Sequence, residues 1–289
     1  MVDKEFVTVK PFGAPRCHLG ESPRWAYGYW WWVDATAGNV YWRPGSSIGD
    51  LAQSPIGVRQ FNARTSLVQP VGDSQVVIAV ENTLRRFSFA KHVLTEIGSP
   101  IELPLPDGFL LNDGIVDGAG NIWIGSVSPD RSPGTGTLLR VTPASDIHQA
   151  LPRFSLTNGM VWDHEQSNLF HVDSYERRIW CHHVHAVTGS IIQSNIFLQL
   201  PSDDGLPDGI SFDPSGILYV AIYGKSVVRA YDMSARLLYE IAIPTEQVTS
   251  VAFGGANNSQ LLITTAQEDF TEVQSLEFPL AGTLFISER

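Results

Sequence analysis

The chain has 289 residues, of which 43% are hydrophobic, 10% aromatic and only 17% charged. This balance is typical of a folded protein with a large core and excludes a disordered segment. Thirty acidic residues against 19 basic ones give a formal net charge of −11, so the long-range field repels nucleic acid and anionic membrane surfaces. We therefore expect no nucleic-acid or membrane partner. The oligomeric state cannot be read from the sequence.

Several features bear on where the protein resides. No run of about 18 apolar residues is present, and residues 1–10 alternate charged and apolar side chains instead of forming a basic start and an apolar leader. The two cysteines, Cys17 and Cys181, lie far apart in the sequence and have no CxxC companion. We expect a soluble, unexported, cytoplasmic protein with free thiols.

Strand-like units recur along the whole chain. They begin at Glu21, Thr65, Asn112, Asn158, Asp208 and Ser250, so their mean spacing is about 46 residues, within the roughly 40 to 50 residues of propeller blades. In each unit a short apolar strand and a polar turn precede a strongly β-forming strand. These second strands are 30–33, 76–79, 122–124, 169–172, 217–220 and 261–264. A third strand often follows, as at 39–42, 136–141, 178–181, 227–231 and 282–286.

The repetition predicts an all-β fold. Antiparallel units that cannot bury both faces alone close most naturally as a six-bladed β-propeller around a central channel. A single domain over residues 1–289 then accounts for the whole chain. An ordinary β-sandwich is the alternative, but it seldom repeats strand triplets at this period.

Residues with a carboxylate or amide side chain open four of the six units. In a propeller the start of each innermost strand lines the channel, so Glu21, Asn112, Asn158 and Asp208 are expected to converge. Two carboxylates in a narrow channel disfavour each other's ionisation unless a cation lies between them, and amide oxygens can complete its shell. The alternative is that these are turn residues, because Asn-Gly and Asp-Gly are common turn signals. Their recurrence at one phase of the repeat favours a divalent cation site.

The sequence resembles the senescence marker protein (regucalcin), gluconolactonase and luciferin-regenerating-enzyme-like family. Six short stretches carry the resemblance in the right order and at the right separations, namely 19–25, 111–121, 157–162, 206–213, 249–255 and 281–285. The resemblance implies a six-bladed propeller with one divalent metal ion in its channel. It also implies, for many members, hydrolysis of sugar-acid lactones.

The resemblance also implies roles for the four residues. Glu21, Asn158 and Asp208 match the family's metal ligands, and Asn112 matches its substrate- or water-contacting asparagine. Asp208 is our candidate general base, although a carboxylate held on a cation is a poor base and a pure ligand role stays open. The oxygen donors favour Ca²⁺, with Zn²⁺, Mg²⁺, Mn²⁺ and Fe²⁺ as alternatives. Asp113 is assigned to the turn, because adjacent strand residues point to opposite faces.

Two departures from the family pattern bear on the substrate. Relatives often carry arginine where this chain has Leu110, and the loop 126–134 lacks a glutamate that some members present to substrate. Both departures favour a smaller or less polar substrate than an aldonolactone, with Arg131 as a possible substitute donor.

The resulting expectation is a metal-dependent lactonase acting on a small-molecule substrate. It would open a small lactone, gluconolactonase-like or less polar, by a metal-polarised carbonyl and an activated water. The alternatives are a phosphotriesterase-like hydrolase on the same fold and a non-catalytic, regucalcin-like calcium-binding protein.

Other conspicuous motifs are expected to be structural. The stretch 181–185 contains one cysteine and three histidines, which we place at the surface, and His18 is expected to be a hydrogen-bonded structural residue. The run Trp30–Trp32 is expected in the core. The aspartates Asp117, Asp163 and Asp213 are expected to cap hairpin turns.

Overall fold

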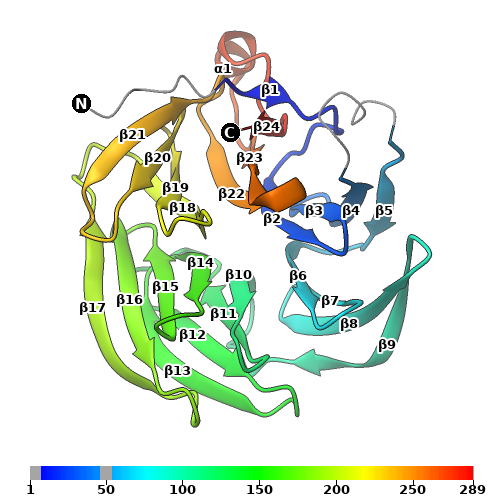
Figure 1. Ribbon diagram of the computed structural model, residues 1–289, viewed down its shortest axis with the longest axis vertical. Coiled ribbons are helices and arrows are strands. Elements are labelled where there is room, and N and C mark those ends of the chain that lie inside the picture. Colours follow the sequence, from blue (N-terminus) through cyan, green and yellow to red (C-terminus); the bar gives the residue numbers. More distant parts are fainter. Residues whose placement is uncertain (1–7, 46–53, 289) are drawn as a thin grey trace.

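The computed structural model describes residues 8–45 and 54–288. These residues form six sheets of four antiparallel strands each, set around a central axis as the blades of a propeller (Figure 1). The six-bladed propeller predicted from the sequence is confirmed. Residues 1–7, on which the expectation of an unexported chain partly rests, lie outside the described residues. No helix in the described ranges is long and apolar enough to cross a membrane.

Each of the first five blades is built from four consecutive strands. Blade 1 comprises β2 (Gly20–Ala26), β3 (Tyr29–Asp34), β4 (Asn39–Pro44) and β5 (Gly57–Gln60). Blade 2 comprises β6 (Thr65–Val71), β7 (Gln75–Val80), β8 (Thr83–Ala90) and β9 (Val93–Glu102). Blade 3 comprises β10 (Leu110–Val116), β11 (Ile122–Val127), β12 (Gly136–Val141) and β13 (Ile147–Phe154). Blade 4 comprises β14 (Thr157–Asp163), β15 (Asn168–Asp173), β16 (Arg178–Val184) and β17 (Ile191–Gln199). Blade 5 comprises β18 (Leu206–Phe212), β19 (Leu218–Tyr223), β20 (Val227–Tyr231) and β21 (Leu237–Ala242).

The sixth blade joins the two ends of the chain. It contains β22 (Val248–Gly254), β23 (Gln260–Thr265) and β24 (Phe285–Glu288), and its outer strand is β1 (Lys10–Pro11), which pairs with β24. The buried Arg43 side chain of blade 1 donates a hydrogen bond to the carbonyl oxygen of Phe12 at 2.8 Å. The N-terminal segment therefore closes the ring, a contact that the repeat analysis did not identify.

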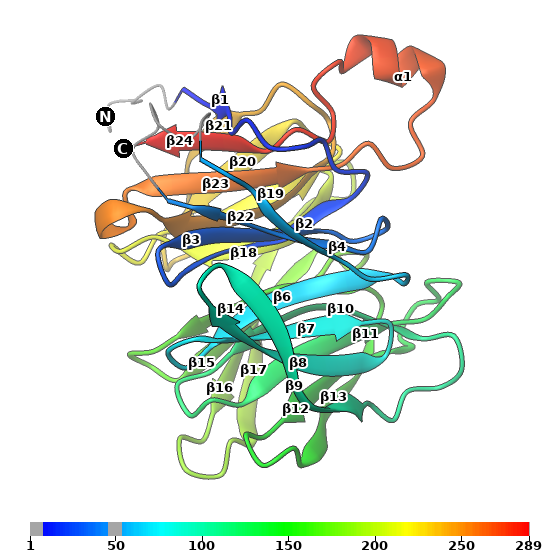
Figure 2. The ribbon, with the colours of Figure 1, turned by 90° about the vertical axis from the view of Figure 1, so that its right-hand side faces the viewer.

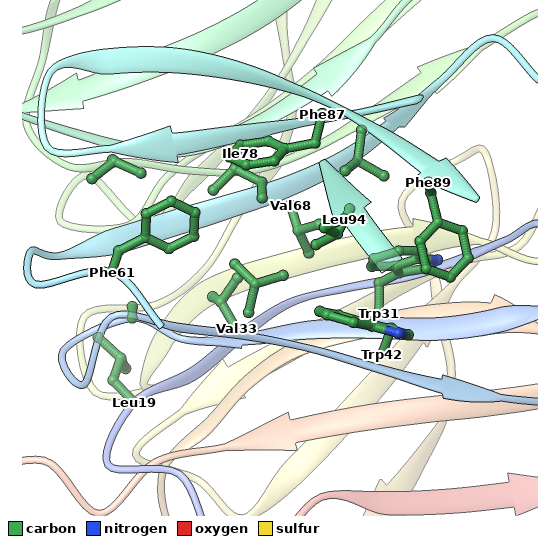
Figure 3. Packing of buried hydrophobic residues seen from close by; sticks show 14 of the residues in the cluster. Leu19, Trp31, Val33, Trp42, Phe61, Val68, Ile78, Phe87, Phe89 and Leu94 are labelled. Atoms are coloured by element: carbon green, nitrogen blue, oxygen red, sulfur yellow. The ribbon is translucent and has the colours of Figure 1, made fainter. Parts of the chain in front are cut away.

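The hydrophobic core is divided among the spaces between neighbouring blades. Between blades 1 and 2, Trp31 packs edge-to-face on Phe89 with ring centroids 4.7 Å apart, and Trp42 lies 5.7 Å from Trp31 (Figure 3). Trp30 and Trp32 point to the other side of β3, into the space between blades 6 and 1. The tryptophan run is thus core packing, as predicted, and alternation along β3 divides it between two interfaces.

Turn aspartates hold the hairpins. Asp117 Oδ1 accepts hydrogen bonds from the backbone nitrogens of Ala119 and Asn121, each at 2.9 Å. Asp213 and Asp163 accept backbone hydrogen bonds in the same way. Their predicted capping role is confirmed.

Two short helices occur in blade 6, η2 (Ala256–Asn258) and α1 (Glu272–Glu277), and α1 projects from the ring (Figure 2). The side chain of Thr271 accepts a hydrogen bond from the backbone nitrogen of Gln274 at 3.2 Å, and the Gln274 side chain accepts one from the Thr271 backbone at 3.1 Å. This capping box begins a helix that the strand periodicity did not predict.

One prediction on the outer strands is wrong. His183 is exposed, as expected, but His182 is only 1% exposed. Neighbours on β16 point to opposite faces, so His182 enters the space between blades 3 and 4, where its ring lies 6.4 Å from that of Phe154. Its Nδ1 is hydrogen-bonded to Ser194 Oγ at 2.8 Å.

Candidate functional site

The innermost strand of each blade lies next to the central axis (Figure 1). Each of these strands is interrupted by an irregularity in its pairing near the same point. In β10, β14 and β18 the first bulged residue is Asn112, Asn158 and Asp208, respectively, so these three occupy equivalent positions. Bulges re-aim side chains, and they commonly lie beside active sites. Glu21 lies one residue before the bulge of its own strand, β2, and still pairs with Val33 of β3. The common phase inferred from the sequence therefore holds for three of the four residues.

Glycines follow two of these residues for a packing reason. A Cβ atom on Gly159 would lie 2.3 Å from the carbonyl oxygen of Asp208, and one on Gly209 would lie 1.9 Å from Ser250 Oγ. The missing side chains let adjacent inner strands approach closely. The turn interpretation of these Asn-Gly and Asp-Gly pairs is wrong.

A cavity of about 230 Å³ opens among the inner strands. All four predicted residues line it. The complete lining is Leu19, Glu21, Arg64, Asn112, Val127, Arg131, Leu156, Asn158, Ser174, Tyr175, Leu206, Asp208, Tyr223 and Glu268. The fold therefore brings together residues that are far apart in the sequence, whereas His18 bonds Thr36 at 2.8 Å and is not part of this lining.

A chain of hydrogen bonds orients the two asparagines. Asn112 Nδ2 donates to the carbonyl oxygen of Thr157 at 2.8 Å and to Asn158 Oδ1 at 3.2 Å. Asn158 Nδ2 donates to Ser174 Oγ at 3.2 Å, and Ser174 in turn donates to the carbonyl oxygen of Pro207 at 2.7 Å. The side-chain nitrogens of both asparagines thus donate to protein acceptors, and these hydrogen bonds fix the orientation of the two side-chain oxygens.

The two carboxylates are in an environment that disfavours their charge. Burial, then the neighbouring Asp113 carboxylate, raises the pKa of Glu21 from 4.5 to about 8. Burial, followed by the charges of Glu21, Asp113 and Glu268, raises the pKa of Asp208 well above its ordinary value. Asp208 Oδ1 is buried and has no hydrogen-bond partner among the described residues. Unpartnered buried oxygen and mutual repulsion are what a bound cation relieves, so the residues fit a metal ion.

A metal ion held here by three protein ligands would need an amide oxygen as one of them. Among the described residues no group of three His, Cys, Asp or Glu side chains is placed to hold a metal ion. A cation between Glu21 and Asp208 would therefore depend on Asn158 as a third oxygen ligand.

Asp113 belongs to this region and not to a turn. It lies in the bulge of β10, is only 6% exposed, and forms an ion pair with Arg24 at 3.0 Å. The turn assignment is wrong, because the bulge suspends the strict alternation of faces on which it was based.

Comparison with known proteins gives the family. A family profile described as the SMP-30/gluconolactonase/LRE-like region matches residues 19–267. The chain belongs to this family. It is 25% identical, over 94% of its length and 92% of the other protein, to the Bacillus subtilis protein named "Putative sugar lactone lactonase YvrE".

Solved structures of SMP-30-like propellers superpose closely on this one. A luciferin-regenerating enzyme gives a TM-score of 0.85 at 22% identity, with 98% of this chain and 95% of that chain covered. Regucalcin from Agrobacterium tumefaciens, described as a calcium-binding protein, gives 0.84 at 23% identity, with 97% and 93% covered. At these identities the likeness supports the propeller fold.

Several lining residues of this SMP-30-like cavity were not identified from the sequence. Arg64, Tyr175, Tyr223 and Glu268 lie outside the quoted family motifs, although Arg64 directly precedes the second repeat unit, which was a usable signal. Arg131 lines the cavity, as the sequence analysis allowed. Leu110 is not among the lining residues.

Proposed function

We propose that this protein is a metal-dependent lactonase that opens a small cyclic ester. The observation that carries the proposal is a pair of mutually repelling carboxylates, the half-buried Glu21 and the buried Asp208, which line a small cavity beside two oriented asparagines. Family membership supports it, as does the lactonase name of the Bacillus subtilis relative.

Glu21, Asn158 and Asp208 would hold the ion. Three oxygen donors from different blades favour a hard divalent cation, Ca²⁺ first, with Mg²⁺, Mn²⁺, Zn²⁺ and Fe²⁺ as alternatives. When bound, the cation would polarise the lactone carbonyl and lower the pKa of a bound water.

The chain's own residues would carry out the remaining steps. Asn112 donates both of its amide hydrogens to Thr157 and Asn158, so it would offer Oδ1 as an acceptor to a substrate hydroxyl or to the attacking water. Asp208 would accept the proton of that water. The water oxygen would bond to the acyl carbon as Asp208 takes one water proton, and the ring C–O bond would break as that proton passes to the leaving ring oxygen. The new carboxylic acid then ionises, so the products are a hydroxycarboxylate and one released proton. A cavity of about 230 Å³ suits a small ring.

The test is a lactone panel assayed with each divalent metal restored to metal-free protein. We expect turnover by the wild type and a loss of about 100-fold or more in Asp208→Ala. Asp146→Ala, which removes an exposed aspartate on an outer hairpin, is the matched control and should retain activity. Turnover above the free-metal rate that survives Asp208→Ala would refute the assignment.

A non-catalytic calcium-binding protein is the main alternative, because the superposed regucalcin is described by its calcium binding. Metal binding without turnover of any lactone would favour it. Adding organophosphates to the panel tests the phosphotriesterase alternative, since a polarising cation can act on P=O as on C=O.

A further inference from the structure

Two arginines face the same cavity as the candidate metal ligands. Arg64 precedes β6, and Arg131 lies on the loop between β11 and β12. Tyr175 Oη accepts a hydrogen bond from Arg131 Nη1 at 3.4 Å. Neither arginine forms an ion pair within the described part of the chain.

Arg64 has no protein partner that explains its position. Its Nε is buried without a hydrogen-bond partner, and its guanidinium makes no hydrogen bond to a described residue. The residue as a whole is half-buried, and a guanidinium whose Nε is buried without an acceptor is costly unless something pairs with it. Burial lowers the pKa of Arg64, and the neighbouring charges of Glu268 and Glu21, which act in the opposite direction, do not fully offset this effect.

The charges that line the cavity indicate the sign of the missing partner. Three carboxylates, those of Glu21, Asp208 and Glu268, face two guanidinium groups. Asp113 is neutralised separately by Arg24. Once a divalent cation keeps the carboxylates ionised, the cavity carries one surplus positive charge. A neutral lactone leaves that charge uncompensated, a monoanion balances it, and a phosphate dianion exceeds it.

We infer that the substrate carries a carboxylate, which Arg64 binds, with Arg131 as a second donor, while the ring carbonyl lies at the metal end of the cavity. The planar donor fork of arginine matches a carboxylate. This inference rests on the proposed lactonase function and deepens it. It also revises the expectation of a less polar substrate, which considered only Leu110 and the loop 126–134.

The first test compares two rings that differ only in charge. Metal-loaded wild type is assayed on γ-butyrolactone-γ-carboxylate and on the corresponding carboxamide. The kcat/KM for the carboxylate should exceed that for the carboxamide by about 10- to 100-fold, which is the contribution expected of one or two charged hydrogen bonds. Arg64→Gln should remove this preference, because it should lower kcat/KM for the carboxylate by about 10- to 100-fold more than for the carboxamide. Arg236→Gln removes an exposed charge on the hairpin between β20 and β21 and should keep the preference.

The second test measures binding without turnover. Calorimetry with tetrahydrofuran-2-carboxylate and its amide, on wild type and Arg64→Gln, separates this inference from the proposed function. Tighter carboxylate binding that depends on Arg64, with no lactone hydrolysed, would support the anion site and reject the lactonase. Lactone turnover with no preference for the carboxylate, or carboxylate binding unchanged in Arg64→Gln, would overturn the anion site alone. If Arg64→Gln does not fold, two other measurements test the anion site. Wild type should bind the carboxylate more tightly than the amide, and Arg131→Gln should bind the carboxylate more weakly than wild type does. Equal binding of the two ligands by wild type would overturn the anion site.

Discussion

At the scale of single residues, the proton and the metal ion compete for the same carboxylates. The folded-state pKa of Glu21, about 8, lies above its ordinary value of 4.5, so the metal-free protein holds a proton there that the unfolded chain releases. The stabilisation from this group is complete below about pH 4.5 and is lost as the pH rises through about 8. Metal binding must expel that proton.

Metal affinity should therefore rise with pH. Between about pH 6 and pH 8 we expect an increase of roughly tenfold per pH unit from release of the Glu21 proton, and release of a proton from Asp208, whose pKa is also raised, makes the increase steeper. Calorimetric titration of wild type and Glu21→Gln measures it, and the variant should have a shallower slope. An affinity that does not change over this range would contradict the account.

A second residue-scale prediction concerns His182. Burial lowers its pKa from 6.5 to about 4, so the neutral ring is favoured in the folded state and stability is lost as the pH falls from 6.5 towards 4. The loss by about pH 5 is on the order of 2 kcal/mol. Urea unfolding at about pH 7.5 and pH 5 should show a smaller difference for His182→Gln than for wild type. His183→Gln, which changes the exposed neighbour, should behave as wild type.

At the scale of elements, the site depends on how closely β14 and β18 approach. Gly159→Ala would force the Asp208 backbone away, because the new Cβ would lie 2.3 Å from its carbonyl oxygen. We expect a loss of about 1–3 kcal/mol in stability and about tenfold weaker metal binding. In the control Gly118→Ala the nearest atoms lie at 3.6 Å, and both properties should be retained. Full metal affinity in Gly159→Ala would mean that this close approach does not position the ligands.

The strands and loops around the site show which features could be predicted from the sequence. Spacing and alternation located the blades, and the polar openings located Asn112, Asn158 and Asp208, because both signals are periodic. Asp113 and His182 were misplaced because a bulge and inter-blade packing decide where those side chains lie. Arg64 and Glu268 were missed because a cavity wall is assembled from loops with no common motif.

At the scale of the whole molecule, ring closure rests on a short N-terminal segment. Phe12 is 1% exposed, packs edge-on against Trp32 at 5.7 Å, and its backbone nitrogen bonds Leu284 at 2.8 Å. Phe12→Ala should cost about 3–5 kcal/mol. Thermal melting measures this loss, and Leu276→Ala, at an 83% exposed position on α1, is the control. Equal melting temperatures for the two variants would show that closure contributes little to stability.

The central claim is that strands from separate blades jointly hold one divalent cation. Anomalous scattering from crystals grown with Mn²⁺ tests it most directly. We expect one strong peak in the channel, within coordination distance of Glu21, Asn158 and Asp208, and no such peak in crystals of Asp208→Ala. A channel without a peak, or a peak bound only by surface residues, would contradict the account.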